Sequence, residues 1–137
     1  MKTQKEHWED VYKTKSADAV SWFQAHAMQS MQLIKSVRAP SSAQIIDVGG
    51  GASTLVDDLL DAGFKNVSVL DLSAEALNLT QTRLGARGHS VEWIAGDIRY
   101  VELEDHRYDI WHDRAVQWIA GCSICAGTTS WRIWLPF

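Results

Sequence analysis

The sequence lacks several features that mark particular classes of protein. No apolar run approaches the roughly 18 residues of a membrane-spanning helix, and the N-terminal segment Met1–Trp8 has no apolar stretch typical of a secretory signal. The formal net charge is −4 and the basic residues are scattered, so the chain has no basic patch for nucleic acid. Its 137 residues have room for one domain. We therefore expect one cytoplasmic domain that binds neither membranes nor nucleic acid.

Cysteine is also scarce, and the two cysteines, Cys122 and Cys125, form a C-x-x-C. A redox pair of this kind normally lies in a thioredoxin-like βαβ unit, and a zinc site needs two further ligands. The sequence around the pair offers neither. We expect no metal site here, and we interpret both cysteines as small, partly buried apolar residues.

The most informative segment is Ile45–Thr54, an apolar strand that ends in Asp47 and leads into the glycines 49–51. Glycine has no Cβ, so a ligand can lie directly against the backbone of such a turn. The next residues predict a helix over 54–62, with Gly63 at its C-terminal stop. A strand, a glycine turn and a helix together present amide donors to a small ligand.

The rest of the chain alternates between helical and strand patterns. Because strands alternate with helices, we expect an α/β fold with a mostly parallel, Rossmann-like sheet. The expected helices cover residues 5–15, about 24–37, 54–62 and from the Ser73 cap to Gly85, and the expected strands cover 43–48, 66–73, 91–94 and 108–112.

Three features narrow the choice of ligand. Thr54 stands where a dinucleotide-binding turn has its third glycine. Asp47 precedes the turn by two residues, where its charge suits a cationic ligand better than a pyrophosphate. Asp71 ends the second strand, within reach of a ribose diol. A cationic ligand that carries a ribose and no phosphate points to S-adenosylmethionine.

These segments resemble the motifs of class I, Rossmann-like S-adenosylmethionine-dependent methyltransferases, in a small bacterial branch, over about residues 6–116. The resemblance implies the family's fold, a three-layer α/β sandwich, and its cofactor. The matching segments are 46–53 for the first motif, 69–73 for the acid after the second strand, 96–98 for the adenine-proximal acid, 108–116 for the fourth strand, and 7–12 with 20–23 at the N-terminus.

The resemblance also implies roles for individual residues. The turn would pass beside the methionine part of the cofactor, with Asp47 near its ammonium group. Asp71 would accept hydrogen bonds from the ribose, Asp97 would bind the adenine amino group, and His112 would face the sulfonium methyl as the catalytic residue. The remaining predicted cofactor contacts are Gly49, Gly50, Gly51, Ser53, Leu72, Gly96 and Ile98, with Trp8, Tyr12 and Trp22 in an N-terminal lid.

Each role has a structural alternative. Asp71 can serve only to cap the next helix, and Asp97 can be a turn residue. His112 can be a histidine without a ligand, and Trp8 and Trp22 can be packing residues of the N-terminal helices.

The C-terminal part departs from the family pattern. Residues 117–137 carry one charge and three of the seven tryptophans, and we hypothesise that they come from a shifted reading frame or a gene fragment. We therefore expect a helical lid over 1–40, a cofactor-binding core over 41–116 with strand order 3-2-1-4, and an atypical apolar tail over 117–137. Either a substitute strand within 130–135 or the pairing of two chains would cover the fourth strand, and we expect a homo-oligomer, a dimer through the edge of the fourth strand or through the tail.

The predicted function is methyl transfer from S-adenosylmethionine to an unidentified small molecule or protein side chain, with His112 as a base or an orienting group. The alternative is a cofactor-binding remnant or interaction module without transferase activity. A hydrolase that uses His112 and an aspartate is a third possibility, disfavoured because no G-x-S-x-G motif occurs.

Overall fold

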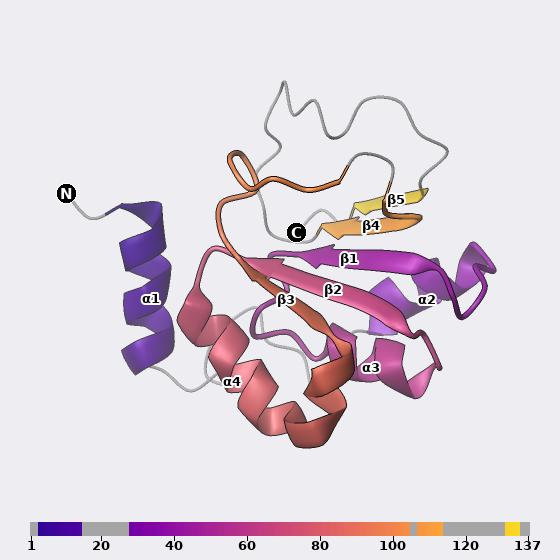
Figure 1. The fold of residues 1–137 in the computed structure, drawn as a ribbon, viewed down its shortest axis with the longest axis horizontal. Helices are drawn as coiled ribbons and strands as arrows, with labels where there is room; N and C mark the ends of the chain where they lie inside the picture. The colour runs from indigo at the N-terminus through magenta and orange to yellow at the C-terminus, as the bar shows by residue number, and fades with distance from the viewer. Residues whose placement is uncertain (1–2, 15–27, 105–106, 114–130, 135–137) are drawn as a thin grey trace.

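The computed structural model describes residues 3–14, 28–104, 107–113 and 131–134 (Figure 1). The helices are α1 (Gln4–Thr14), α2 (Met28–Ser36), α3 (Leu55–Asp61), α4 (Ala74–Leu84) and a 3₁₀ helix, η2 (Gly85–Ser90). The strands are β1 (Gln44–Val48), β2 (Asn66–Asp71), β3 (Glu92–Ala95), β4 (Ile110–Asp113) and β5 (Trp131–Trp134). Every predicted helix and strand is found, with shifts at the ends, whereas η2 was not predicted.

The strands form one parallel sheet in the order β3-β2-β1-β4-β5. This confirms the predicted Rossmann-like α/β fold and its strand order 3-2-1-4. Strand β5 pairs with β4, with Ile110 opposite Trp131 and Asp113 opposite Trp134. The tail therefore supplies the substitute fifth strand, the first of the two expected arrangements, and β4 is not an open edge.

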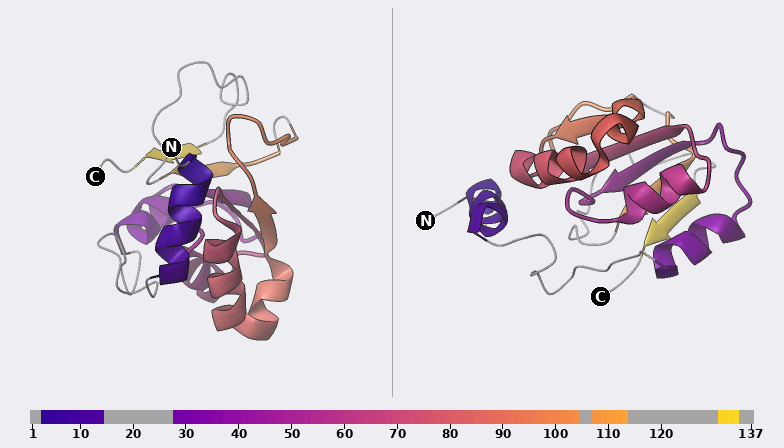
Figure 2. Two further views of the ribbon diagram at one scale, coloured as in Figure 1. Left: turned by 90° about the vertical axis from the view of Figure 1, so that its left-hand side faces the viewer. Right: turned by 90° about the horizontal axis from the view of Figure 1, so that it is seen from below.

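One face of the sheet is covered by helices α2, α3 and α4, which lie on the side facing the viewer in the right-hand view of Figure 2. The apolar core between helices and sheet explains why these segments fold: side chains spaced three or four residues apart on each helix meet the alternate residues of each strand. The largest core cluster includes Met31, Ile34, Ile45, Leu59, Val69, Leu77 and Ile110.

The opposite face is covered by the segment that follows β3. Ile46, Val48 and Leu70 of the sheet pack there with Tyr108 and with partly buried residues of the connection, such as Val101. In the described part of the chain no helix lies on this face. The connection 114–130 between β4 and β5 is outside the described residues, so the expected third layer stays a prediction.

Two local signals in the sequence set helix ends as predicted. The Ser73 side chain accepts a hydrogen bond from the Ala76 amide at 3.2 Å and caps α4. At the end of α3, the amide of Gly63 donates to the Leu60 carbonyl and the amide of Phe64 to the Leu59 carbonyl, at 3.0 and 3.1 Å. This is the Schellman pattern that ends a helix.

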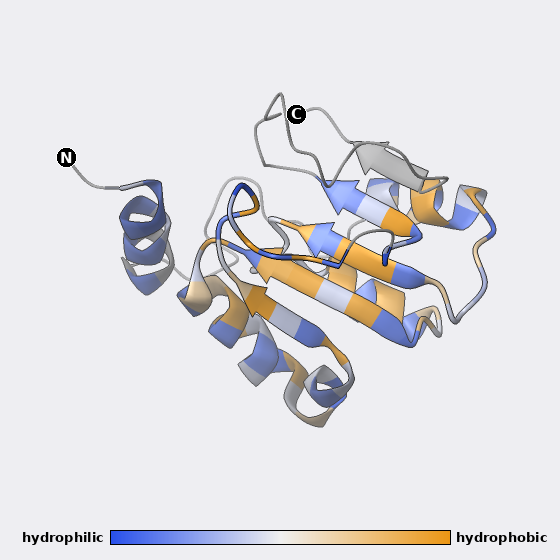
Figure 3. Ribbon diagram, turned by 45° about the horizontal axis from the view of Figure 1, so that its top comes forward, coloured by the Kyte–Doolittle hydropathy of each residue, from blue (hydrophilic) through white to orange (hydrophobic). Residues whose placement is uncertain are grey.

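Helix α1 differs from the other helices in its composition. Figure 3 shows it largely hydrophilic, whereas β1 and β2 are largely hydrophobic. Its first turn is closed by a capping box, in which the Thr3 amide donates to Glu6 and the Glu6 amide donates to the Thr3 hydroxyl. The helix stands beside the N-terminal end of α4 (Figure 1).

Two leucines test the position of the core. Leu59 of α3 is fully buried, whereas Leu79 of α4 is 40% exposed. We expect Leu59→Ala to lower the free energy of unfolding by about 2–5 kcal/mol, because it removes buried apolar surface and leaves a cavity. Leu79→Ala, the matched control, should change it by less than about 1 kcal/mol. Urea denaturation measures both, and equal losses would contradict the described core.

Candidate functional site

The candidate site lies where the parallel strands end. In a parallel sheet all carboxyl ends meet at one edge, which is the usual ligand-binding edge of an open α/β sheet. Here that edge gathers Asp47 from β1, Asp71 from β2, and His112 from β4. The strand order therefore brings together residues separated by up to 65 positions in the sequence.

The glycine turn after β1 is packed tightly against two carboxylates. Gly49 has a φ of 77° and donates its amide to the Leu70 carbonyl at 2.7 Å. A Cβ on Gly50 would lie 2.0 Å from Oδ2 of Asp47, and a Cβ on Gly51 would lie 2.7 Å from Oδ2 of Asp71. No side chain fits at either position without moving a carboxylate, so both residues have to be glycine.

Asp71 binds the backbone on both sides of the site. Its Oδ2 accepts the Gly51 amide at 2.9 Å, and its Oδ1 accepts the Ser73 amide at 2.8 Å. Burial raises the pKa of Asp71 above the ordinary value, and the charges of Asp47 and Glu9 add to the rise, while the two amides lower it. Each oxygen keeps a second lone pair that can accept a hydroxyl of a ligand.

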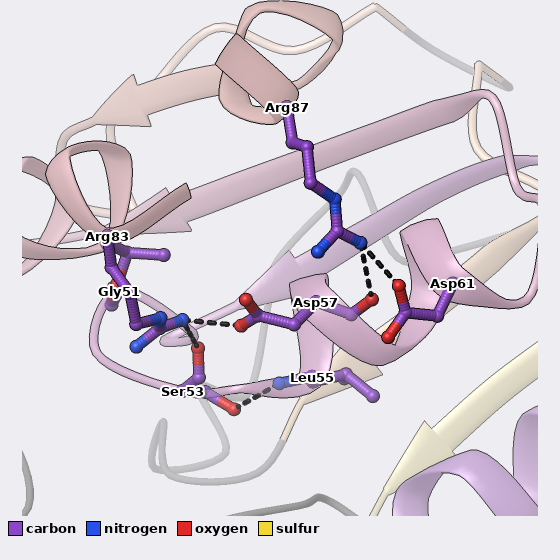
Figure 4. A network of polar contacts seen from close by, with 8 residues as sticks. Gly51, Ser53, Leu55, Asp57, Asp61, Arg83 and Arg87 are labelled. Carbon is purple, nitrogen blue, oxygen red and sulfur yellow. Dashed lines mark hydrogen bonds and ion pairs between the residues drawn. The ribbon is translucent and has the colours of Figure 1, made fainter. Parts of the chain in front are cut away.

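Helix α4 holds the other side of the turn. The Thr80 hydroxyl, fully buried, donates to the Gly51 carbonyl. Arg83 donates to the Ser53 carbonyl at 3.3 Å and pairs with Asp57 of α3 at 2.5 Å (Figure 4). The exposed ion pair itself contributes at most about 1 kcal/mol. The contacts of Arg83 hold the turn and the start of α3 in place against α4.

A second ion pair repeats this link one helical turn further along. Arg87 pairs with Asp61 at 2.5 Å, and its guanidinium lies 3.5 Å from the Asp57 carbonyl (Figure 4). The Ser53 hydroxyl, which was predicted to contact the cofactor, accepts the Leu55 amide at 3.1 Å. Ser53 thus serves the first turn of α3 in this structure.

Helix α1 reaches the site through two side chains. Oε1 of Glu9 accepts the Ala74 amide at 2.7 Å, at the N-terminus of α4. Trp8 packs against Ala52 of the glycine turn and Ala76 of α4. Trp8 is therefore beside the turn, where the lid was expected. The Tyr12 side chain and the whole of Trp22 lie outside the described residues.

The third acidic position, Asp97, is engaged with its neighbour Arg99. Oδ1 accepts the Arg99 amide at 2.9 Å, and the guanidinium binds both carboxylate oxygens. The hydrogen bonds from Arg99 lower the pKa of Asp97. In this arrangement both carboxylate oxygens of Asp97 bind Arg99 within the turn that follows β3.

The neighbours of Asp97 join it to the site. The Gly96 amide donates to the Asp71 carbonyl at 2.9 Å, so the turn after β3 stays beside β2. Ile98 packs against the cluster on the far face of the sheet, and both Ile98 and Leu72 are partly buried. Both side chains keep some exposed surface near the ends of β2 and β3.

His112 is buried, with a relative exposure of 2%. Its Nδ1 lies 2.7 Å from Oδ1 of Asp47, and its Nε2 lies 2.9 Å from the hydroxyl of Ser30 on α2. Both ring nitrogens are therefore used within the protein. The other carboxylate oxygen of Asp47, Oδ2, is buried and has no hydrogen-bond partner among the residues that the structure describes.

Several polar residues that hold this site were not predicted. The N-terminal motif contained Glu9, but nothing marked it as a partner of α4. Thr80 lies on the buried stripe of α4 with Ala76, Leu77 and Leu84, so helical periodicity could have found it. Ser30 follows Ala27 by three residues on the expected apolar stripe of its helix. Arg83 had no distinguishing signal.

Two further properties concern residues 3–14, 28–104, 107–113 and 131–134. There, no group of three or more histidine, cysteine and acidic side chains could bind a metal ion. Within the same ranges, no helix is both long and apolar enough to cross a membrane. Cys122 and Cys125 lie outside these ranges.

Comparison with known proteins identifies the family. The model of the methyltransferase domain family matches residues 45–124, which is more than half of the chain. The mouse (Mus musculus) eEF1A lysine and N-terminal methyltransferase is 20% identical over 109 residues, which cover 80% of this chain and 15% of the mouse protein.

Solved structures show the same fold. The glycopeptide N-methyltransferase MtfA, complexed with S-adenosyl-L-homocysteine, matches with a TM-score of 0.56 and 21% identity over 67% of this chain. The CcbJ methyltransferase of Streptomyces caelestis matches with a TM-score of 0.56 and 19% identity over 77% of this chain.

This chain is much shorter than the proteins it matches. It spans 15% of the mouse relative, 40% of MtfA and 41% of CcbJ. The matched segment nevertheless contains the glycine turn, Asp71, Asp97 and His112. The chain belongs to the methyltransferase domain family, as the resemblance of its motifs predicted.

Proposed function

We propose that the chain binds S-adenosylmethionine at the glycine turn and transfers its methyl group to an acceptor, a small molecule or a protein side chain. One observation carries this proposal: the buried Asp71 carboxylate holds the amide of Gly51 while keeping lone pairs for a ribose. The family match and the neighbour complexed with S-adenosyl-L-homocysteine support it.

The residues present fit such a cofactor. Asp71 offers acceptors for the ribose hydroxyls, and Asp47 and Glu9 add negative charge near the turn that favours a cationic ligand. Asp97 offers acceptors for an adenine amino group once Arg99 shares or releases them. Leu72 and Ile98 supply apolar surface, and Trp8 supplies one side of a lid.

The bound cofactor would supply an electrophilic methyl group on a sulfonium. The chain's own tasks are to align this group with the acceptor and to exclude water. The glycine turn and Asp71 provide the alignment, because both are fixed by hydrogen bonds within the fold. Helix α1, held by Glu9 and Trp8, provides cover at the N-terminal end of α4.

A cofactor-binding module without transferase activity is the alternative. The chain spans 40% of MtfA and 41% of CcbJ, so methyl transfer is proposed here separately from cofactor binding. A hydrolase is disfavoured, because His112 is buried and both its ring nitrogens are engaged. It has no free nitrogen to activate water.

Calorimetric titration tests cofactor binding directly. We expect S-adenosylmethionine and S-adenosylhomocysteine to bind with one site per chain, and NAD to give no heat, because the turn lacks the third glycine of a dinucleotide site. A parallel assay of methyl transfer into cell lysate separates the enzyme from the binding module. Absence of binding by both adenosyl ligands would contradict the proposed function.

Asp71→Asn tests the predicted ribose contact. The amide group would place a donor against the Gly51 or Ser73 amide and remove a ribose acceptor, so we expect the Kd for S-adenosylhomocysteine to rise about 10-fold to 100-fold. The wild type should also bind the 2′-deoxy ligand more weakly, and the variant should lose this discrimination. Asp61→Asn, an exposed matched control, should leave both affinities unchanged. Retained discrimination in Asp71→Asn would show that another group binds the ribose.

The cytoplasmic location expected from the sequence stays a prediction. We also propose that the chain forms a homodimer. The sheet edge supports this proposal: β5 is short and ends the strand order of the described residues, and an edge strand can pair with a second chain. Light scattering at micromolar concentration should give twice the mass of one chain. The mass of a single chain would contradict the dimer.

A further inference from the structure

The strongest unexplained feature is a row of three buried polar side chains that runs from a helix to the glycine turn. Ser30 of α2, His112 of β4 and Asp47 of β1 are each at most 2% exposed. Two hydrogen bonds of 2.9 and 2.7 Å join them in that order. Burial of a polar group is costly without partners, so this arrangement calls for an explanation.

The sheet register explains how the row forms. Asp47 and His112 are directly opposite each other in the β1–β4 ladder, so their side chains lie on the same face of the sheet. That face carries α2, and Ser30 lies on its buried side with Met31 and Ile34. The row thus connects three elements through side chains alone.

The hydrogen bonds fix the orientation of the Asp47 carboxylate. A carboxylate only accepts, so Nδ1 of His112 is the donor to Oδ1. In a neutral ring Nε2 then accepts from the Ser30 hydroxyl, which holds the imidazole in this tautomer and orientation. With Oδ1 bound to His112, Oδ2 lies 2.0 Å from the position that a Cβ of Gly50 would take, at the inner side of the turn.

We propose that His112 and Ser30 are positioning residues that orient Asp47 beneath the glycine turn and so set the site for the amino-acid end of the cofactor. The inference rests on the proposed function, since Asp47 is the residue expected near the cofactor's ammonium group. It assigns His112 a role other than contact with the sulfonium methyl. It also gives the buried, unpartnered Oδ2 of Asp47 a purpose.

A pair of ligands separates positioning from plain stability. S-adenosylhomocysteine carries the amino-acid end, whereas 5′-methylthioadenosine shares the adenosine and thioether but lacks that end. We expect His112→Gln to weaken the binding of S-adenosylhomocysteine about tenfold or more, and Ser30→Ala to weaken it several-fold. The affinity for 5′-methylthioadenosine should change less than about twofold in both variants. Calorimetric titration measures both ligands.

Matched controls come from the same chain. His89→Gln changes an exposed histidine, and Ser36→Ala changes an exposed serine of α2 whose hydroxyl donates to the Leu33 carbonyl. Neither control should alter either affinity. If His112→Gln does not fold by circular dichroism, Ser30→Ala decides the question, because it removes only one oxygen.

Several outcomes would overturn the inference. Equal losses for both ligands would mean that the row serves stability alone. Unchanged affinities in a folded His112→Gln variant that has lost methyl transfer would make His112 a catalytic residue. A wild type that binds neither ligand would contradict the proposed function itself. If the wild type binds both ligands and the variants bind them equally well, the proposed function stands and the positioning role is wrong.

Discussion

The hydrogen bond between the Asp71 carboxylate and the Gly51 amide is the interaction on which the rest of the site depends. It joins the end of β2 to the turn after β1, and the other oxygen of Asp71 fixes the start of α4 through Ser73. A Cβ on Gly51 would lie 2.7 Å from Oδ2 of the same carboxylate, so no side chain fits there unless the carboxylate moves. Burial raises the pKa of Asp71, and a buried carboxylate is costly for the fold. A carboxylate of this kind at the carboxyl edge of a sheet is typical of a ligand site.

The turn is held from every side by groups of different elements. Thr80 and Arg83 of α4 bind its carbonyls, Asp47 lies beneath Gly50, and Trp8 of α1 packs on Ala52. Such a turn needs little reorganisation when a ligand arrives, and preorganisation of this kind favours both binding and alignment. The contacts of Trp8 and Glu9 also explain why the hydrophilic helix α1 stays beside α4 although it adds little to the core.

The sequence allowed most of the fold to be predicted, because buried strands and amphipathic helices leave strong periodic patterns, and Ser73 and Gly63 mark helix ends locally. The positions of Asp47, Asp71 and Asp97 at strand ends were predictable for the same reason. The partners of these residues were not. Ser30 and His112 are 82 residues apart, and their contact depends on how α2 packs on the sheet. The Arg99 guanidinium binds the Asp97 carboxylate, and this contact depends on a turn whose conformation the sequence did not reveal.

The central claim is that the glycine turn and Asp71 form the cofactor site. Amide chemical shifts in a ¹H–¹⁵N NMR titration with S-adenosylhomocysteine test it most directly, because they report on each backbone position separately. We expect saturable shifts concentrated at Gly49, Gly50 and Gly51, at Asp71, and at Gly96–Ile98. Shifts confined to other parts of the chain, or no saturable shifts at all, would contradict it.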